Sequence, residues 1–224
     1  MRLQEKLDAF TDKLIGSGKF PAAVLEILHR STEELIATGQ AGRALKAGDT
    51  APDFTLPDPD GKAVSSRQLL AKGPLVVTFY RGVWCPYCNL DLQALEETRS
   101  EIEARGASLV AISMQTAPNS RKSERDNNLG FPILTDFKGE LAEKFGLRWQ
   151  LSEEMVNFYK NMASIDLSKV NGEESWTLPM PARYVIGRDG VIAYAEVNPD
   201  YTKRPDPSDL FPVLDSLASA RAGA

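Results

Sequence analysis

The sequence predicts an α/β fold in which a central mixed β-sheet is flanked by helices and preceded by a helical N-terminal extension. From residue 65 onward, short apolar runs typical of buried strands alternate with segments of helical pattern. This alternation favours a sheet with helices on both faces. The last two apolar runs are separated by the turn Arg188-Asp189-Gly190, which predicts an antiparallel hairpin and makes the sheet mixed.

Residues 1–47 predict the helical extension. Apolar side chains recur there at spacings of three and four, as in an amphipathic helix; they are Leu3, Leu7, Phe10 and Leu14. A break is expected at residues 16–20, and a second helix then runs from Pro21 to a C-terminal cap at Gly39. The apolar stripes suit packing on the chain's own domain or on a partner subunit, so a homodimer stays open.

One domain over residues 48–224 follows the extension. Residues 48–62 are rich in Pro, Asp and Gly and predict extended chain with a turn at Asp60–Gly61. Residues 150–180 are long for a connection and predict an insertion with a helix at about 152–162, which serves as decoration or as a wall or lid of a site. The other elements are expected in this order: a short helix (65–73), a strand (74–80), a helix (85–106), a strand (108–113), a helix (119–130), a strand (131–136), a short helix (139–147), the hairpin (182–197) and a last helix (208–222) whose start Pro212 shortens or kinks.

The composition excludes several classes of function. The formal net charge is −5, whereas nucleic-acid binding usually needs a basic face. Residues 1–14 carry charges throughout and lack the apolar stretch of a secretory signal, and the longest apolar run, residues 74–80, is too short to span a bilayer. We therefore expect no nucleic-acid partner, no membrane partner and a cytoplasmic location, where a disulfide is more often transient than structural.

Metal binding is disfavoured as well. The chain has two cysteines, Cys85 and Cys88, and one histidine, His29, whereas a tetrahedral zinc site normally takes four ligands of these types. His29 falls in the second N-terminal helix and is expected to be a surface or packing residue. We expect no metal and no cofactor.

The stretch WCPYC (residues 84–88) predicts a reactive thiol pair. It follows a buried strand and opens a helix, where free backbone N–H groups and the helix dipole favour a thiolate over a thiol. Pro86 suits the first turn of that helix, and Cys88 lies one turn after Cys85, so a disulfide can close without unfolding. We expect Cys85 to be the more accessible, attacking sulfur and Cys88 the more protected, resolving one; an inert buried pair is the alternative.

Pro181 stands immediately before the predicted strand that contains Arg183. A cis peptide bond before Pro181 would expose the backbone of Met180 for pairing with a peptide or with glutathione. A trans proline that starts a strand is the alternative.

The stretches LVVTFYRGVWCPYC and GDTAPDFTLPDPDGKAVSSRQLL together resemble the alkyl hydroperoxide reductase/thiol-specific antioxidant (AhpC/TSA) family, in particular its peroxiredoxin-like branch. The resemblance runs from about Gly48 to Val197 and implies a thioredoxin-like fold and a cis bond at Pro181. It implies a thiol-dependent peroxidase in which the Cys85 thiolate reduces hydrogen peroxide or an organic hydroperoxide and becomes a sulfenic acid. Cys88 would then form a disulfide with Cys85, which thioredoxin, glutaredoxin or glutathione reduces.

The chain departs from this family at three positions. The family has a proline seven residues before its reactive cysteine and a Thr or Ser three before it, where this chain has Thr78 and Gly82. The family arginine of the late strand aligns with Pro181; Arg183, two residues along on the same face, is the expected catalytic substitute, and Arg81 is a further candidate. The expected substrate-binding residues are Arg81, Trp84, Tyr87, Met180 and Pro181.

Two other functions stay open at this point. The dithiol and the missing hydroxyl at Gly82 also suit a disulfide oxidoreductase of the thioredoxin or glutaredoxin kind. A protein without catalytic activity, whose disulfide changes an interaction of the N-terminal helices, would sense redox state instead.

Overall fold

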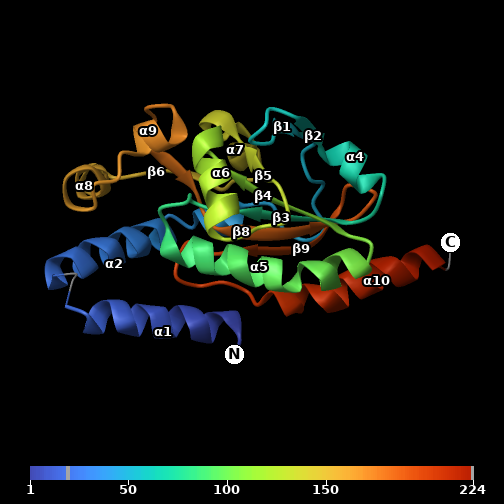
Figure 1. The fold of residues 1–224 in the computed structure, drawn as a ribbon, viewed down its shortest axis with the longest axis horizontal. Helices are drawn as coiled ribbons and strands as arrows, with labels where there is room; N and C mark the ends of the chain where they lie inside the picture. Colours follow the sequence, from blue (N-terminus) through green and yellow to red (C-terminus); the bar gives the residue numbers. More distant parts are fainter. Residues whose placement is uncertain (19–20, 223–224) are drawn as a thin grey trace.

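A computed structural model of the chain describes residues 1–18 and 21–222. Their main sheet has the strand order β5-β4-β3-β8-β9 (Figure 1). Strand β3 runs parallel to β4, and β4 runs parallel to β5, whereas β8 is antiparallel to both β3 and β9. The sheet is therefore mixed, as predicted. Its strands are β3 (Leu75–Phe79), β4 (Ser108–Ser113), β5 (Ile133–Thr135), β8 (Ala182–Ile186) and β9 (Ile192–Val197).

Helices cover both faces of this sheet. The main helices of the domain are α4 (Ser66–Leu70), α5 (Pro86–Ala104), α6 (Ala117–Asp126), α7 (Glu140–Lys144) and α10 (Phe211–Ala222), and the 3-10 turns are η1 (Phe137–Gly139) and η3 (Pro207–Leu210). One hydrophobic core lies between the sheet and α5 with α10, and a second lies between the sheet and α7 with α4 (Figure 1). Every residue of β3 is buried, which is why its sequence is apolar except for Thr78.

The N-terminal extension forms α1 (Leu3–Gly16), α2 (Ala22–Ala37) and the short α3 (Gln40–Arg43). Helix α1 packs on α5 of its own chain (Figure 1) through the buried side chains of Leu3 and Leu7. The apolar stripe of α1 therefore covers a surface of the chain's own domain. Helix α2 ends at the predicted place, with Gly39 in the left-handed conformation at a φ of 65°. The predicted break at residues 16–20 includes residues 19–20, which lie outside the described part.

Residues 55–65 form a hairpin that the sequence predicts only in part. The turn at Asp60–Gly61 is where it was expected, but it connects two strands, β1 (Thr55–Pro57) and β2 (Ala63–Ser65), which pair antiparallel. Each strand is three residues long, too short for a period-two pattern to be legible.

The insertion at residues 150–180 is framed by a second two-stranded sheet. Its strands are β6 (Arg148–Gln150) and β7 (Thr177–Pro179), and its helices are α8 (Glu153–Asn157), the π-helical turn η2 (Phe158–Met162) and α9 (Leu167–Asn171). Helix α8 and η2 together occupy the predicted helical segment. They lie beside α2, to which they are joined by an ion pair between Arg30 and Glu154 (Figure 1). In the described residues, no helix is long and apolar enough to cross a membrane.

Candidate active site

The two cysteines lie where strand β3 passes into helix α5. Cys85 is the residue before the first helical residue and has an extended backbone, and Pro86 takes the first helical position, where its missing N–H costs nothing. Cys88 follows one turn later. Its S–H donates to the Cys85 Sγ atom at 2.8 Å, and both cysteines are free thiols. A disulfide between them therefore needs only a local rotation of side chains.

Both thiols are buried, so the predicted difference in accessibility between Cys85 and Cys88 is small in exposed area. The exposed fraction is 1% for Cys85 and 0% for Cys88. Cys85 lines a cavity together with Tyr159 and Tyr201. These rings come from the insertion and from the C-terminal loop, segments whose position the sequence around the cysteines does not reveal. Cys88 is not among the described residues that line this cavity, so the two sulfurs still differ in their surroundings.

The two thiols also differ in acidity. Burial opposes the thiolate of Cys85, but the hydrogen bond from Cys88 and the positive charges of Arg81 and Arg204 outweigh it and lower the pKa of Cys85 to about 6. Burial raises the pKa of Cys88 well above its ordinary value, and the hydrogen bond to Cys85 and the charge on Cys85 raise it further. At neutral pH the pair therefore holds one thiolate, on Cys85, and one thiol, on Cys88.

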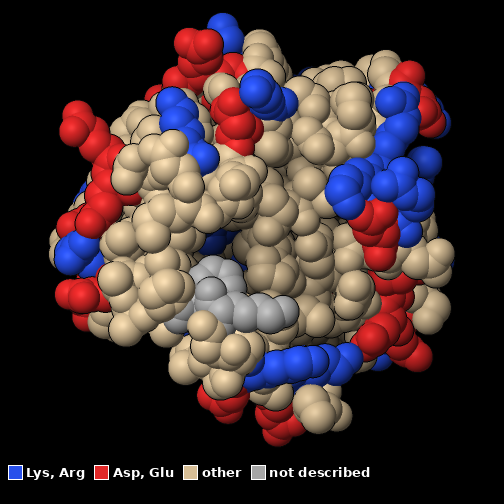
Figure 2. All heavy atoms as spheres, turned by 60° about the vertical axis from the view of Figure 1, so that its left-hand side comes forward, with Lys and Arg blue, Asp and Glu red and all other residues tan. Residues whose placement is uncertain are grey.

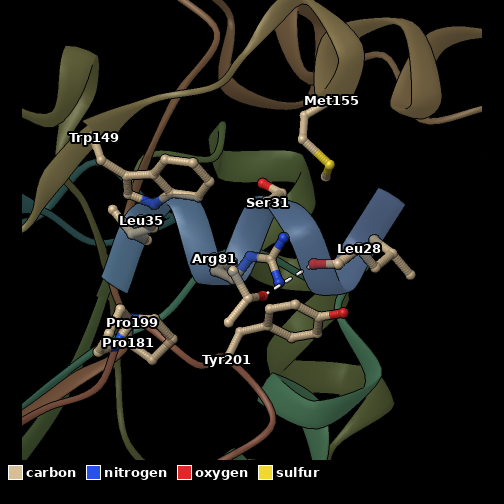
Figure 3. Close-up of a pocket in the computed structure, with 10 residues that line it drawn as sticks. Leu28, Ser31, Leu35, Arg81, Trp149, Met155, Pro181, Pro199 and Tyr201 are labelled. Carbon is tan, nitrogen blue, oxygen red and sulfur yellow. Dashed lines mark hydrogen bonds between the residues drawn. The ribbon is translucent and has the colours of Figure 1, made fainter. Parts of the chain in front are cut away.

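Arg81 lies buried next to this thiolate. Its guanidinium stacks 4.2 Å from the ring centre of Tyr201 and 4.9 Å from that of Trp84, and it donates to the Tyr159 hydroxyl. Figure 3 shows it under helix α2, beside Tyr201 and Leu28. Among the described residues, none accepts a hydrogen bond from the buried Nε atom of Arg81, so one donor of this cation is still available.

A second cation, Arg204, was not predicted. It is 9% exposed, and its Nη2 atom lies 3.5 Å from the Cys88 Sγ atom. Its Nε atom lies 3.4 Å from a carboxylate oxygen of Asp91. Arg204 belongs to a polar loop without any pattern that marks a buried site. Asp91 could have been found from the sequence, because a carboxylate three residues after Cys88 falls on the buried face of an amphipathic helix.

Arg183 is placed differently from the prediction. Its guanidinium donates to Asp91 and, at 3.1 Å, to the Pro205 carbonyl, rather than to either sulfur. The sheet register explains this position of Arg183, because it places Arg183 opposite Thr78 on β3. There the carboxylate of Asp91 on α5 pairs with the guanidinium. Arg183 and Arg204 thus share one buried carboxylate.

The missing hydroxyl at Gly82 has a structural explanation in Trp84. A Cβ atom built on Gly82 would lie 2.6 Å from the indole Nε1 atom of Trp84, and the φ of Gly82 is 146°. Position 82 therefore has no room for the Thr or Ser expected there, because the indole occupies that space. The ring of Trp84 is held by an edge contact with Tyr159 at 5.1 Å. Its Nε1 atom is buried and has no hydrogen-bond partner in the part of the chain that the structure describes.

Tyr87, between the two cysteines, connects the site to the N-terminal extension. Its hydroxyl lies 2.9 Å from that of Thr11. Its ring makes edge contacts with Phe10 at 5.2 Å and with Tyr201 at 5.5 Å. Helix α1 is thereby fixed against the first turn of α5.

Met180 and Pro181 do not offer the peptide-binding backbone that was expected. The described residues contain no cis peptide bond, so the prediction of a cis bond at Pro181 is wrong. Met180 is fully buried, and its N–H donates to the Leu147 carbonyl at 2.9 Å. The physical reason is that β7 pairs with β6 across the insertion, which uses this stretch of backbone.

The fold and the site together define a class: this is a thioredoxin-like α/β protein with a buried dithiol at the start of a helix. The model of the AhpC/TSA family matches residues 47–195. The chain belongs to this family.

Similar proteins agree with this assignment. A putative peroxiredoxin of Mycobacterium tuberculosis is 29% identical over 125 residues, which cover 56% of this chain and 81% of that protein. Peroxiredoxin Bcp of Escherichia coli is 31% identical over 103 residues, 46% of this chain and 65% of that one. The crystal structure of peroxidoxin BcpB from Mycobacterium tuberculosis superposes with a TM-score of 0.60 at 23% identity, covering 78% of this chain and 97% of that chain. The last likeness concerns the fold.

Proposed function

We propose that this protein is a thiol-dependent peroxidase in which Cys85 is the nucleophile and Cys88 the resolving thiol. The observation that carries the proposal is the contrast in acidity across the pair: the pKa of Cys85 is about 6, whereas that of Cys88 is raised well above its ordinary value. The Cys85 thiolate attacks one oxygen of the peroxide and becomes a sulfenic acid, and water or an alcohol leaves. The Cys88 sulfur then displaces that hydroxyl as water and forms the disulfide.

The interaction between the two sulfurs also explains why Cys88 reacts second. While Cys85 is a thiolate, its charge and its hydrogen bond keep Cys88 protonated. Oxidation of Cys85 to a neutral sulfenic acid removes both effects, whereas the charges of Arg204 and Arg81, which lower the pKa of Cys88, stay in place. Cys88 therefore becomes the nucleophile only after the peroxide has reacted.

The reaction rate of the reduced protein with hydrogen peroxide tests the proposal. Because the thiolate is the deprotonated form, the rate should rise with pH through a midpoint near the pKa of Cys85, about 6, and level off above it. Arg81→Met removes a charge that favours the thiolate and should move this midpoint upward. Stopped-flow measurements from about pH 4.5 to about pH 9, a range that includes this midpoint, give both profiles. A plateau no faster than free cysteine would exclude the peroxidase.

Trp84 replaces the hydroxyl that is absent at Gly82. Its indole N–H, which has no partner among the described residues, would donate to the peroxide oxygen as negative charge develops there. Trp84→Phe keeps a ring in this place and removes the donor, so the rate constant with hydrogen peroxide should fall roughly ten- to hundred-fold, the range for a hydrogen bond to a charged group. The pH midpoint should stay unchanged, which separates this role from an effect on the thiolate. An unchanged rate constant would show that the indole N–H takes no part.

The reductant and the location belong to the same proposal. Turnover needs a dithiol or thiol donor for the Cys85–Cys88 disulfide, and thioredoxin, glutaredoxin and glutathione in the cytoplasm have this chemistry.

The CPYC sequence and the acidic Cys85 also favour a second candidate, a disulfide oxidoreductase. The backbone N–H of Met180 is already hydrogen-bonded to Leu147, so it is not free to pair with a disulfide substrate, which disfavours the oxidoreductase. Reduction of insulin disulfides at the rate of peroxide reduction would favour this second candidate.

A further inference from the structure

Arg204 lies against the second sulfur of the pair and outside the cavity at Cys85. Its Nη2 atom lies 3.5 Å from the Cys88 Sγ atom, and it is not among the described residues that line the cavity. Figure 2 shows a hollow on this side of the molecule whose visible walls are mostly uncharged side chains. Arg81, by contrast, lines the cavity together with Cys85. Arg204 is therefore placed to act on Cys88, and Arg81 to act on Cys85.

The other two nitrogens of the Arg204 guanidinium hold the group in place. Its Nη1 atom donates to the carbonyls of Tyr201 at 2.8 Å and Lys203 at 2.7 Å. Its Nε atom lies 3.4 Å from a carboxylate oxygen of Asp91. A guanidinium presents its donors in a rigid planar fork, so contacts at two nitrogens also fix the third. The contacts of Nη1 and Nε therefore keep Nη2 directed at the Cys88 sulfur.

The charge of Arg204 is not needed to balance Asp91. Arg183 already forms an ion pair with that carboxylate, and the side chains of Arg183, Asp91 and Arg204 are 1%, 3% and 4% exposed. Two guanidinium groups and one carboxylate leave one positive charge without a carboxylate of its own in this cluster. A buried charge is costly unless it has a partner. The Cys88 sulfur, in its thiolate form, is the group that would supply one.

Helix α1 holds the loop that carries Arg204. The side chain of Gln4 accepts a hydrogen bond from the Arg204 N–H at 3.0 Å and donates one to the Thr202 carbonyl at 3.3 Å. Helix α1 and this loop both lie outside residues 47–195, the part of the chain that matches the family model. The cation beside Cys88 is thus positioned by two segments from outside that part.

We infer that Arg204 is a catalytic residue of the second step, in which Cys88 forms the disulfide, and that Gln4 is a positioning residue that holds Arg204 there. The inference rests on the proposed peroxidase function. In this step Cys88 releases its proton, and its sulfur attacks the sulfur of Cys85–SOH. The S–S bond forms with an electron pair of Cys88 as the S–O bond breaks, so Cys88 is oxidised and the Cys85 sulfur is reduced. The departing hydroxide takes up a proton and leaves as water. The charge of Arg204 stabilises the Cys88 thiolate that makes this attack.

The charged and titratable groups around Cys88 determine how this step depends on pH. Those that interact electrostatically with its thiol are Cys85, Arg81, Arg204, Tyr80 and Tyr159. Burial raises the pKa of Tyr159 to about 12 and also raises that of Tyr80, so both stay neutral at physiological pH. Asp91, on the same helix, is paired with Arg183 and Arg204. Once Cys85 is an uncharged sulfenic acid, the charges of this group that act on Cys88 are therefore those of the two arginines.

The ionisation of Cys88 tests this role without any peroxide. In the Cys85→Ser protein the serine is uncharged, as the sulfenic acid would be, and the ultraviolet absorbance of the thiolate follows the titration of Cys88. The protein that lacks both thiols is the blank. Adding Arg204→Met should move the midpoint of the titration to higher pH, and adding Arg204→Lys, which keeps the charge, should move it less. An unchanged midpoint with Arg204→Met would overturn the inference.

Single-turnover reactions with excess hydrogen peroxide test the role in catalysis. Rapid acid quenching and mass spectrometry distinguish the sulfenic acid from the disulfide, so the two steps are timed separately. Arg204→Met should slow the disulfide step roughly ten- to hundred-fold, the range for a hydrogen bond to a charged group, and should increase the sulfinic acid formed instead. The first step should keep its rate on the plateau above its pH midpoint. Lys203→Met is the matched control, because it removes the neighbouring charge, which is 47% exposed and pairs with Asp8.

Gln4→Ala keeps Arg204 but loosens its loop, so the disulfide step should slow by a smaller factor, at most roughly ten-fold, with no change in the first step. Gln40→Ala is its control, because Gln40 also bonds an N-terminal helix to backbone carbonyls, those of Gly146 and Arg148. Equal losses in both steps, or equal effects of the two glutamine variants, would contradict the inference. If the wild-type protein yields neither product with peroxide, the proposed function fails, and the titration of Cys88 still decides whether Arg204 acts on this sulfur.

Discussion

Replacing Cys85 with Ser is expected to abolish peroxide reduction, with a fall in kcat/KM of about a thousand-fold or more, as for other catalytic nucleophiles. A serine hydroxyl keeps the size of the side chain but is not ionised at neutral pH, so the charges that lower the pKa of Cys85 have no thiolate to stabilise. Peroxide consumption in the presence of a dithiol reductant measures the loss. A kcat/KM above about a tenth of the wild-type value would show that Cys85 is not the nucleophile.

Cys88→Ser is the control for this experiment, because it removes the neighbouring thiol and leaves the nucleophile. The first reaction with peroxide should persist, whereas the disulfide cannot form. A sulfenic acid should accumulate on Cys85 and be trapped by dimedone, detected by mass spectrometry. If dimedone instead labels Cys88 in the Cys85→Ser protein, the two roles are reversed. In Cys88→Ala, which also removes the hydrogen-bond donor, the pKa of Cys85 should rise.

Asp91→Ala is expected to destabilise the protein by about 3–5 kcal/mol, the usual cost of breaking a buried ion pair by removing one partner. Asp91 is the shared counter-charge of Arg183 and Arg204, and the three side chains are 3%, 1% and 4% exposed. Without the carboxylate, two guanidinium groups stay in the core and repel each other. Urea denaturation of the wild-type and variant proteins measures the difference in the free energy of unfolding.

Asp53→Ala is the matched control for this prediction. Asp53 also pairs with an arginine, Arg67, at 2.5 Å, but their side chains are 52% and 79% exposed. Water screens such pairs, so the expected change in stability is much smaller than that of Asp91→Ala. Equal effects of the two substitutions would contradict the view that burial makes the Asp91 cluster important.

The apolar runs at residues 74–80, 108–113 and 131–136 contain strands β3, β4 and β5 as predicted. These strands are buried on both faces by helices, so their sequences carry a continuous local signal. The hairpin of β8 and β9 was equally legible from the turn at Asp189–Gly190. Helix α5 begins after Cys85 as predicted, because Pro86 suits only the first turn of a helix.

Strand β2 and the π-helical turn η2 were not predicted. Strand β2 is three residues long and exists because it pairs with β1. The π-helical turn occupies part of a segment that has an ordinary helical composition, and the sequence does not distinguish a local five-residue turn from an α-helix. In both places the hydrogen bonds that define the element are not encoded in a repeating pattern.

The sequence by itself determined that a buried strand delivers two thiols, Cys85 and Cys88, to the first turn of a helix, since these elements depend on neighbouring residues. The tertiary structure decided which charges meet them. Arg204 follows Cys88 by 116 residues, and it reaches the sulfur only because the C-terminal loop folds under α5. The same holds for Tyr159, whose ring contacts the Trp84 indole, and for the cavity that Cys85 lines. Ion pairs, contacts and cavities form between segments far apart in the chain, and no local pattern of residues records which segments those are.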